Sequence, residues 1–150
     1  MQATFRQATL EDIPGIVELT NECFNEKTDV AHAEKIFQTN DAAAIYCVGF
    51  LENQIVAFAR ISIITTPFDG METYAILNHV CVKPEYRRHH LGTQLLTAIE
   101  DICRKQGCSS LKLWSKNFRI PAHAMYQKFG FKIIDAKFFE KSLEGGTNEN

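Results

Sequence analysis

The spacing of hydrophobic residues in the first part of the chain predicts one short strand followed by two helices. Residues 4–8 alternate as in a half-buried strand. After them, apolar side chains recur at the spacing of one helix face, and Pro14 fits because it lies near the first turn. A second, shorter helix is predicted over about residues 30–38. The face of the first helix consists of Ile13, Ile16, Val17, Thr20 and Phe24.

The rest of the chain alternates between β-rich runs and helical periods. Residues 43–51 and 54–65 are β-rich and are separated by Glu52-Asn53, which predicts an antiparallel hairpin. A helix is predicted to begin at Leu91, where an apolar stripe starts, and another spans residues 121–128 and is closed by Gly130. Further strands are predicted over residues 74–82, 111–114 and 131–139.

The predicted order of elements, β-α-α-β-β-β-α-β-α-β, joins a run of antiparallel strands to an alternation of strands and helices. This order indicates the α/β (α+β) class, with three layers and a mixed central sheet of about six to seven strands that has helices on both faces. The length of 150 residues suits one domain. We expect the domain to span residues 1–143 and residues 144–150 to form a disordered tail.

Composition and charge argue against several classes of function. The formal net charge is -2 and the pI is near 6.2, so no overall basic field would hold nucleic acid. The five cysteines are odd in number and scattered, as in reduced cytoplasmic proteins. No apolar run approaches the roughly 18 residues that cross a bilayer, and the histidines and cysteines lack metal-ligand spacing. We therefore expect a cytoplasmic location, no nucleic-acid or membrane partner and no metal.

The stretch of residues 80–93 leads a predicted strand into a predicted helix and carries two adjacent arginines. Backbone N–H groups in the first turn of a helix have no partner within the helix, and the helix dipole is positive there, so this turn suits a diphosphate. Arg87 and Arg88 add mobile cationic donors, and Gly92 allows the backbone to approach a phosphate closely. The alternative interpretation is a solvated basic turn without a ligand.

This stretch resembles the acetyl-CoA motif of the GNAT superfamily of N-acetyltransferases, R/Q-x-x-G-x-G/A after a V-x-V strand. Arg87, Gly92 and the strand match the motif, whereas His90 stands where the first glycine is usual. The resemblance implies acetyl-CoA as the acyl-donor cosubstrate. The residues that it implies for cofactor binding are Val80, Cys81, Val82, Arg87, Arg88, His89, His90, Leu91, Gly92 and Thr93.

A second stretch resembles the superfamily's N-x-x-A-x-x-x-Y signature, which a G-F/Y pair follows. Ala122, Tyr126, Gly130 and Phe131 have the matching spacing, and Arg119 stands where an asparagine often contacts CoA. Two motifs in the right order are more specific than either alone. The resemblance implies an acetyl-CoA-dependent N-acetyltransferase that acts on a primary amine of a small molecule, and a homodimer formed through the last strand is plausible by the same analogy.

Transfer of an acetyl group to an amine needs a polarised carbonyl, a proton acceptor for the amine and a proton donor for the leaving thiolate. The resemblance assigns the donor to Tyr126 and the carbonyl contacts to the main chain of residues 80–82. The base stays open between His79, Asn78 acting through water, and none, because that strand carries no carboxylate. The alternative from another class is a catalytically silent acyl-CoA-binding or regulatory module.

The acceptor is expected to contact the segment between the first two helices and the loop of residues 66–71. Phe24, Phe68, Asp69 and Glu72 would frame a cationic amine there. A small primary amine, an aminoglycoside-like or aminophosphonate compound and a protein N-terminus each fit this description. The acceptor therefore stays open between a small molecule and a protein amine.

Overall fold

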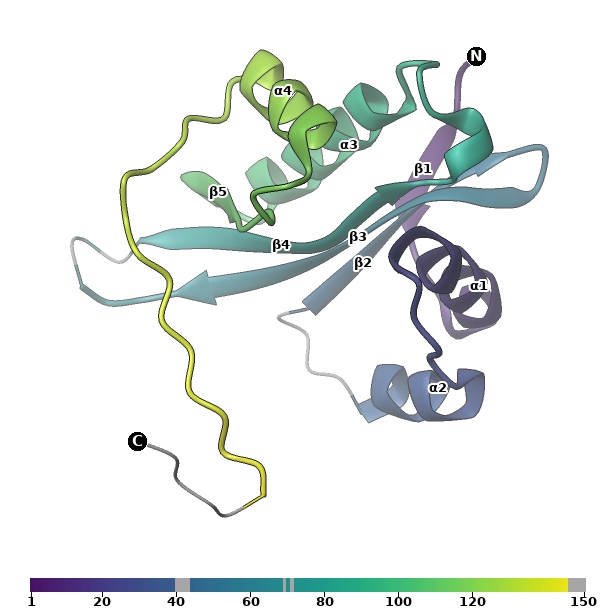
Figure 1. Ribbon diagram of the computed structural model, residues 1–150, viewed down its shortest axis with the longest axis horizontal. Helices are drawn as coiled ribbons and strands as arrows, with labels where there is room; N and C mark the ends of the chain where they lie inside the picture. Colours follow the sequence, from purple (N-terminus) through teal and green to yellow (C-terminus); the bar gives the residue numbers. More distant parts are fainter. Residues whose placement is uncertain (40–43, 69, 71, 146–150) are drawn as a thin grey trace.

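The computed structural model describes residues 1–39, 44–68, 70 and 72–145 as one sheet flanked by helices (Figure 1). Its strands are β1 (Thr4–Gln7), β2 (Ala44–Leu51), β3 (Gln54–Thr65), β4 (Thr73–Val82) and β5 (Ser110–Leu113). Its helices are α1 (Ile13–Phe24), α2 (Val30–Thr39), α3 (Leu91–Lys105) and α4 (Ile120–Phe129), with short 3-10 turns at Leu10–Asp12 and Pro84–Tyr86. No helix in these described ranges is long and apolar enough to cross a membrane.

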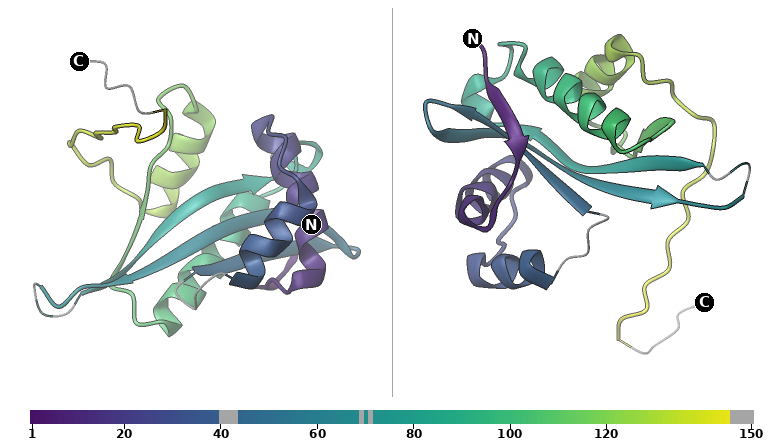
Figure 2. Two further views of the ribbon diagram at one scale, coloured as in Figure 1. Left: turned by 90° about the horizontal axis from the view of Figure 1, so that it is seen from below. Right: turned by 180° about the vertical axis from the view of Figure 1, so that it is seen from behind.

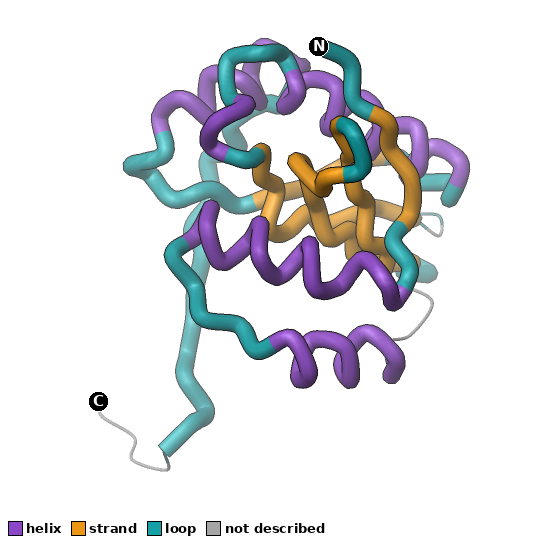
Figure 3. The backbone as a smooth tube through the Cα atoms, turned by 90° about the vertical axis from the view of Figure 1, so that its right-hand side faces the viewer, coloured by secondary structure: helices purple, strands orange, loops and turns teal. Residues whose placement is uncertain are grey.

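The strands form one sheet in the order β1-β2-β3-β4-β5, in which each neighbouring pair is antiparallel except β4 and β5, which run parallel. Helices α3 and α4 cover one face of the sheet, and α1 and α2 cover the other (Figures 2 and 3). The predicted three-layer class is therefore confirmed. The sheet of the described residues has five strands, fewer than the six or seven predicted.

Each interface between the layers has its own hydrophobic core. The core between the sheet and α3 and α4 includes Leu95 and Leu96, which are fully buried. The core between the sheet and α1 includes Ile13 and Val17, at 1% and 5% exposure. The apolar stripes that the sequence pattern predicts on α1 and α3 are thus the faces that pack on the sheet. Strand β4 contributes side chains to both cores.

The prediction of a last strand over residues 131–139 is wrong. The chain leaves α4 at Gly130, whose φ is 111°, and continues without helix or strand to residue 145 (Figure 1). Ile133 and Ile134 are 77% and 76% exposed, and Phe138 and Phe139 are 66% and 86% exposed. No strand of the described residues pairs with this segment, so its apolar side chains are not covered by the sheet or its helices. The predicted tail, residues 144–150, lies mostly outside the described residues.

Candidate active site

Strand β4 carries a bulge in its second half. In the pairing with β3, Asn78 lies opposite Arg60 whereas Cys81 lies opposite Phe58, so β4 holds one residue more than β3 over this stretch. The extra residue is accommodated around His79, which adopts a left-handed φ of 53°. A bulge of this kind bends a strand and redirects the side chains beyond it.

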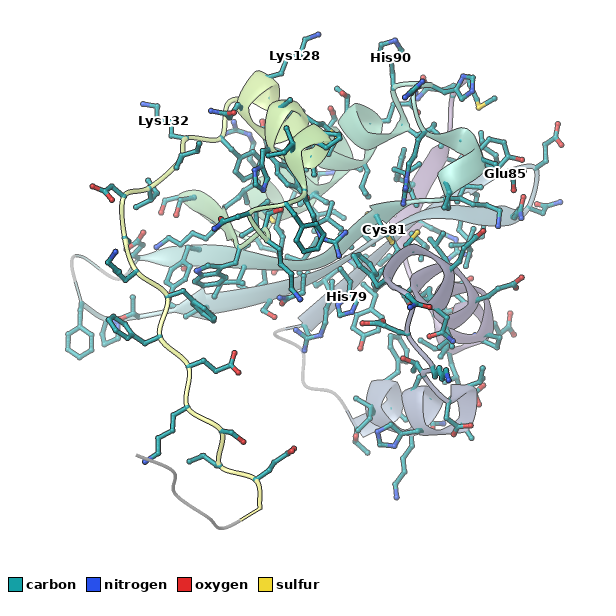
Figure 4. The ribbon with its side chains drawn as sticks, viewed as in Figure 1. His79, Cys81, Glu85, His90, Lys128 and Lys132 are labelled. Carbon is teal, nitrogen blue, oxygen red and sulfur yellow. The ribbon has the colours of Figure 1, made fainter. Side chains whose placement is uncertain are left out.

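The bulge determines which side chains of β4 face each layer. Leu77 before it, and Val80 and Val82 after it, all pack against the core beneath α3 and α4. Cys81 packs instead in the core beneath α1. If the strand alternated regularly from Leu77 without a bulge, Cys81 would instead face α3 and α4, and Val80 and Val82 would face α1. His79 and Cys81 consequently lie where β4 passes α1 (Figure 4).

Beyond Leu77, the outer edge of β4 has no partner strand among the described residues. Strand β5 pairs only with residues 74–77 of β4, through residues 110–113, and ends there. The main-chain N–H and C=O groups of residues 78–82 on this side, apart from the carbonyl of Val82, are therefore open to an extended ligand, which can add to the sheet as a strand does.

The loop between β4 and α3 is held against the end of β4. The guanidinium of Arg87 donates from Nε to the carbonyl oxygen of Val82 at 3.2 Å, and the Cys23 thiol donates to the same oxygen at 3.5 Å. Arg87 therefore lies against the end of the strand. Arg88 is exposed and forms no ion pair within the part of the chain that the structure describes.

The start of α3 presents main-chain donors that no side chain caps. Its N-cap residue is His90, with φ 63° and ψ 15°, and the first turn contains no acidic residue. The left-handed φ of His90 explains why the resembling motif usually has a glycine there, since glycine adopts this conformation without a steric penalty. The amides of residues 91–93 are consequently free for an anion. His90 itself projects outward from the loop (Figure 4).

Gly92 lies at the contact between α3 and α4. A Cβ atom at this position would overlap the sulfur of Met125. The missing side chain therefore lets α4 approach the first turn of α3, a steric reason that the sequence analysis did not identify. Leu91, another residue predicted to bind the cofactor, is 1% exposed, so its side chain is not available for that role.

Tyr126 is a buried phenol on α4. Its side chain is 9% exposed, belongs to the core beneath α3 and α4, and lies edge-on to Phe131 at 5.7 Å between ring centroids. Burial raises the pKa of Tyr126 above its usual value, while the charge of Arg119 acts in the opposite direction. Val80 and Val82, after the bulge of β4, pack against the same core as Tyr126. At neutral pH the hydroxyl is protonated and can donate a proton.

Four side chains from three parts of the chain meet beside the bulge. His79 Nε2 lies 3.0 Å from Glu26 Oε2, and the His79 ring meets the Phe24 ring edge-on at 5.0 Å between centroids. The guanidinium of Arg119, the N-cap residue of α4, lies 5.3 Å from the centroid of the Phe24 ring. The end of α1 thus contacts both the bulge of β4 and the start of α4.

The structure brings together only part of the predicted acceptor site. Phe24 lies beside His79, as described above, but Phe68 and Glu72 belong to the β3–β4 turn, at the opposite end of β4 from the loop that leads into α3 (Figure 1). Asp69 lies outside the described residues. Sequence reasoning missed Glu26, because its pairing with a residue 53 positions away has no local signal in the sequence.

A cavity of about 310 Å³ lies away from Tyr126 and the bulge, between the first half of α1 and the β2–β3 hairpin. Its lining is largely polar and includes Glu11, Asp12, Glu18, Asn53 and Lys83. It contains neither the uncapped helix start nor a proton donor placed beside an open strand edge. We therefore locate the candidate active site at the bulge of β4 and the start of α3.

Known proteins share the sequence pattern and the fold of this chain. The model of the family described as "Acetyltransferase (GNAT) family" matches residues 13–131. The chain is 26% identical over 140 residues to the uncharacterized protein YyaT of Bacillus subtilis, a match that covers 92% of this chain and 88% of that protein. It is 20% identical over 154 residues to spermidine N(1)-acetyltransferase of Thermoplasma acidophilum, a match that covers 90% of this chain and 91% of that protein. The fold resembles that of ribosomal-protein-alanine N-acetyltransferase from Brucella melitensis, with a TM-score of 0.80, 16% identity and coverage of 95% and 100%.

Proposed function

We propose that this chain, which belongs to the acetyltransferase (GNAT) family, transfers an acetyl group from acetyl-CoA to the primary amine of a small molecule. The family and its named relatives make the protein an acyltransferase of the N-acetyltransferase type. One arrangement supports the finer proposal: Val80 and Val82 of the open edge of β4 pack in the same core as the buried Tyr126, and the uncapped start of α3 follows the end of that strand.

The residues present fit a coenzyme that has a diphosphate and an extended amide-containing arm. The main-chain amides at the start of α3 would hold the diphosphate, with the exposed Arg88 beside them. The open edge of β4 over residues 78–82 would pair with the amides of the arm and with the acetyl carbonyl. When bound, acetyl-CoA supplies an acyl group activated as a thioester.

Tyr126 serves as the proton donor in this proposal. Its raised pKa keeps the phenol protonated at the pH where an amine attacks, so a proton is available for the departing thiolate. The positive charge of Arg119 favours the phenolate that remains, because it lowers the pKa that burial raises. Burial therefore keeps the proton on the phenol before the thiolate leaves, and Arg119 stabilises the phenolate afterwards.

His79 is the proton acceptor that this geometry favours among the alternatives. Its Nε2 faces the carboxylate of Glu26 at 3.0 Å, so the neutral ring donates from Nε2 and leaves Nδ1 to accept the proton of the amine. Glu26 then stabilises the imidazolium, as a carboxylate does beside a catalytic histidine. Asn78 has no titratable group and is therefore the weaker candidate.

The acceptor that best suits the side chains beside the bulge is a small amine carrying positive charge. Glu26 places a carboxylate beside His79 at the end of α1, and this carboxylate would attract the ammonium form before His79 removes its proton. A protein amine is the second candidate, because the chain shares its fold with a ribosomal-protein-alanine N-acetyltransferase. A panel of acceptors separates the two.

The experiment is a thiol-release assay with acetyl-CoA and three acceptors: spermidine, an aminoglycoside, and a peptide with an N-terminal alanine. We expect turnover with at least one of the small amines and little with the peptide. Tyr126→Phe is the matched control, since it keeps the ring and removes only the proton donor. Calorimetric binding of acetyl-CoA without turnover on any acceptor would contradict the proposal and favour a silent binding module.

A further inference from the structure

Arg119 is a partly buried cation that aromatic rings hold and no carboxylate neutralises. Its guanidinium carbon lies 5.3 Å from the centroid of the Phe24 ring and 5.2 Å from the centroid of the Phe118 ring, within the range of cation–π contacts. Among the described residues its guanidinium forms neither an ion pair nor a side-chain hydrogen bond. Its N–H donors are therefore not used by the described part of the chain.

The other arginines show that this state is unusual in the molecule. Four of them donate from the side chain to an oxygen atom of the protein, namely Arg6, Arg60, Arg87 and Arg104. Arg88 is exposed, so water solvates its charge. Arg119 is partly buried, which removes some of that water. An oxyanion that replaces the remaining water at Arg119 would therefore form strong, charge-assisted hydrogen bonds.

Arg119 lies beside the groups to which the proposed function assigns the proton transfers. The Phe24 ring also meets the His79 ring, at 5.0 Å between centroids. The guanidinium carbon and the centre of the His79 ring are thus no farther apart than these two distances laid end to end. Arg119 and Tyr126 are seven positions apart, about two helical turns, so they occupy the same side of α4. The unpaired cation consequently borders the place of the reacting amine.

The charges around the Phe24 ring are complementary to a molecule with two opposite charges. The carboxylate of Glu26 contacts His79, at 3.0 Å between Oε2 and Nε2, and forms no printed pair with Arg119 within the described chain. The first turn of α4 contains no acidic residue that would compete for the guanidinium. One end of the Phe24 ring therefore favours an ammonium group, and the other favours an anion.

We propose that Arg119 binds an oxyanion of the acceptor, a carboxylate or a phosphate group, so that the preferred acceptor is an amine that carries an anionic group elsewhere in the molecule. This acceptor class rests on the proposed function and narrows it. The amine lies toward Glu26 and His79, the oxyanion accepts two parallel hydrogen bonds from the planar guanidinium, and the chain between them passes along the Phe24 ring.

Matched pairs of acceptors test this preference by steady-state kinetics with acetyl-CoA. The carboxylate pair is 4-aminobutanoate and 4-aminobutanamide, and the phosphate pair is 3-aminopropyl phosphate and 3-aminopropanol. We expect the wild type to prefer the anionic member of at least one pair by at least about tenfold in kcat/KM, the size of a charge-assisted hydrogen bond. The pair with the larger ratio identifies which oxyanion Arg119 binds.

Substitution of Arg119 should remove the preference without removing turnover of the neutral amines. Arg119→Gln lacks the charge and the fork, so its ratio should fall to about one. Any general effect on Tyr126 cancels, because it acts on both members of a pair. Arg119→Lys keeps the charge but not the bidentate geometry and should retain an intermediate ratio. Arg104→Gln removes an exposed arginine of α3 that pairs with Glu100, and its ratio should equal that of the wild type.

Calorimetry on the protein saturated with coenzyme A gives a measurement that does not depend on turnover. We expect 4-aminobutanoate or 3-aminopropyl phosphate to bind about tenfold more weakly to Arg119→Gln than to the wild type, and the neutral partner to bind both forms equally. If Arg119→Gln fails to fold, as judged by thermal unfolding, Arg119→Lys serves in its place, with a smaller loss confined to the anionic acceptor.

Three results would overturn the proposal: equal kcat/KM within both pairs in the wild type, a preference that persists in Arg119→Gln, or weaker binding of acetyl-CoA to Arg119→Gln with an unchanged acceptor preference. The last would assign Arg119 to the coenzyme. A wild type that binds no acetyl-CoA and acetylates no amine contradicts the proposed function instead. The two failures are distinguishable, because loss of the preference alone leaves acetyl transfer intact.

Discussion

The two sides of the proposed active site are built from different kinds of groups. On the cofactor side, the groups offered to a ligand belong to the main chain: the open edge of β4 and the uncapped amides at the start of α3. On the acceptor side they are side chains, namely Phe24, Glu26, His79 and Arg119, which come from the end of α1, the bulge and the start of α4. The bulge of β4 belongs to both sides.

This difference determines how each side responds to substitution. Main-chain groups persist when a residue changes, so the cofactor side should depend on backbone conformation and on space for the ligand. A substitution removes the functional group of a side chain, so the function of the acceptor side should depend on residue identity. We therefore expect changes on the cofactor side to alter acetyl-CoA affinity and changes on the acceptor side to alter turnover.

The largest effect is expected from Tyr126→Phe, which removes the proton donor between the two sides. We expect kcat to fall on the order of a hundredfold, in the range of general acid catalysis, with unchanged affinity for acetyl-CoA. Steady-state kinetics and calorimetry measure the two quantities. Equal turnover would remove Tyr126 from the mechanism.

Because burial raises the Tyr126 pKa above its usual 10.0, loss of the phenol proton should not reduce the wild-type rate below about pH 10.

The next largest effect is expected from a carboxylate introduced at the start of α3, which should lower the affinity for acetyl-CoA. Gly92→Glu places a negative charge beside the amides that would hold the diphosphate, and its side chain also meets Met125. We expect acetyl-CoA to bind at least about tenfold more weakly. Gly92→Gln has a similar size without the charge and should lose less. Equal losses in both variants would mean that helix packing, rather than anion binding, explains the glycine.

Removal of the imidazole tests the acceptor side. His79→Asn keeps a residue that tolerates the left-handed φ of 53° but lacks a proton acceptor. We expect kcat to fall about tenfold, less than a typical general base contributes, because the fraction of the amine that is already neutral can still attack. Affinity for acetyl-CoA should be unchanged. In Glu26→Gln, kcat should fall less, because this change removes only the stabilisation of the imidazolium. A His79→Asn variant with wild-type kcat would show that the amine loses its proton by another route.

The smallest effect concerns the backbone of the cofactor side. His90→Gly should stabilise the fold by about 1 kcal/mol, because glycine adopts φ 63° without the penalty that histidine has. This corresponds to a rise in Tm of about 2–4 °C for a domain of this size, measured by thermal unfolding. His89→Gly is the matched control in the same loop: His89 is not among the residues with positive φ, so this change should lower Tm.

Local sequence patterns predicted the parts of the fold that depend on local periodicity. Strand β3 has the predicted bounds, 54–65, and α1 and α3 bury the predicted apolar stripes. The bulge at His79 and its pairing with Glu26 escaped prediction because both depend on how distant segments meet. The strand predicted over residues 131–139 failed for the same reason: β propensity alone does not supply a neighbouring edge.

The most direct test of the account is a crystal structure of the protein with bound acetyl-CoA. The account predicts that the diphosphate accepts hydrogen bonds from the amides of residues 91–93 and that the thioester arm pairs with the main chain of residues 78–82. Coenzyme bound in the cavity lined by Glu11, Glu18 and Lys83, or bound without contact to the edge of β4, would contradict it.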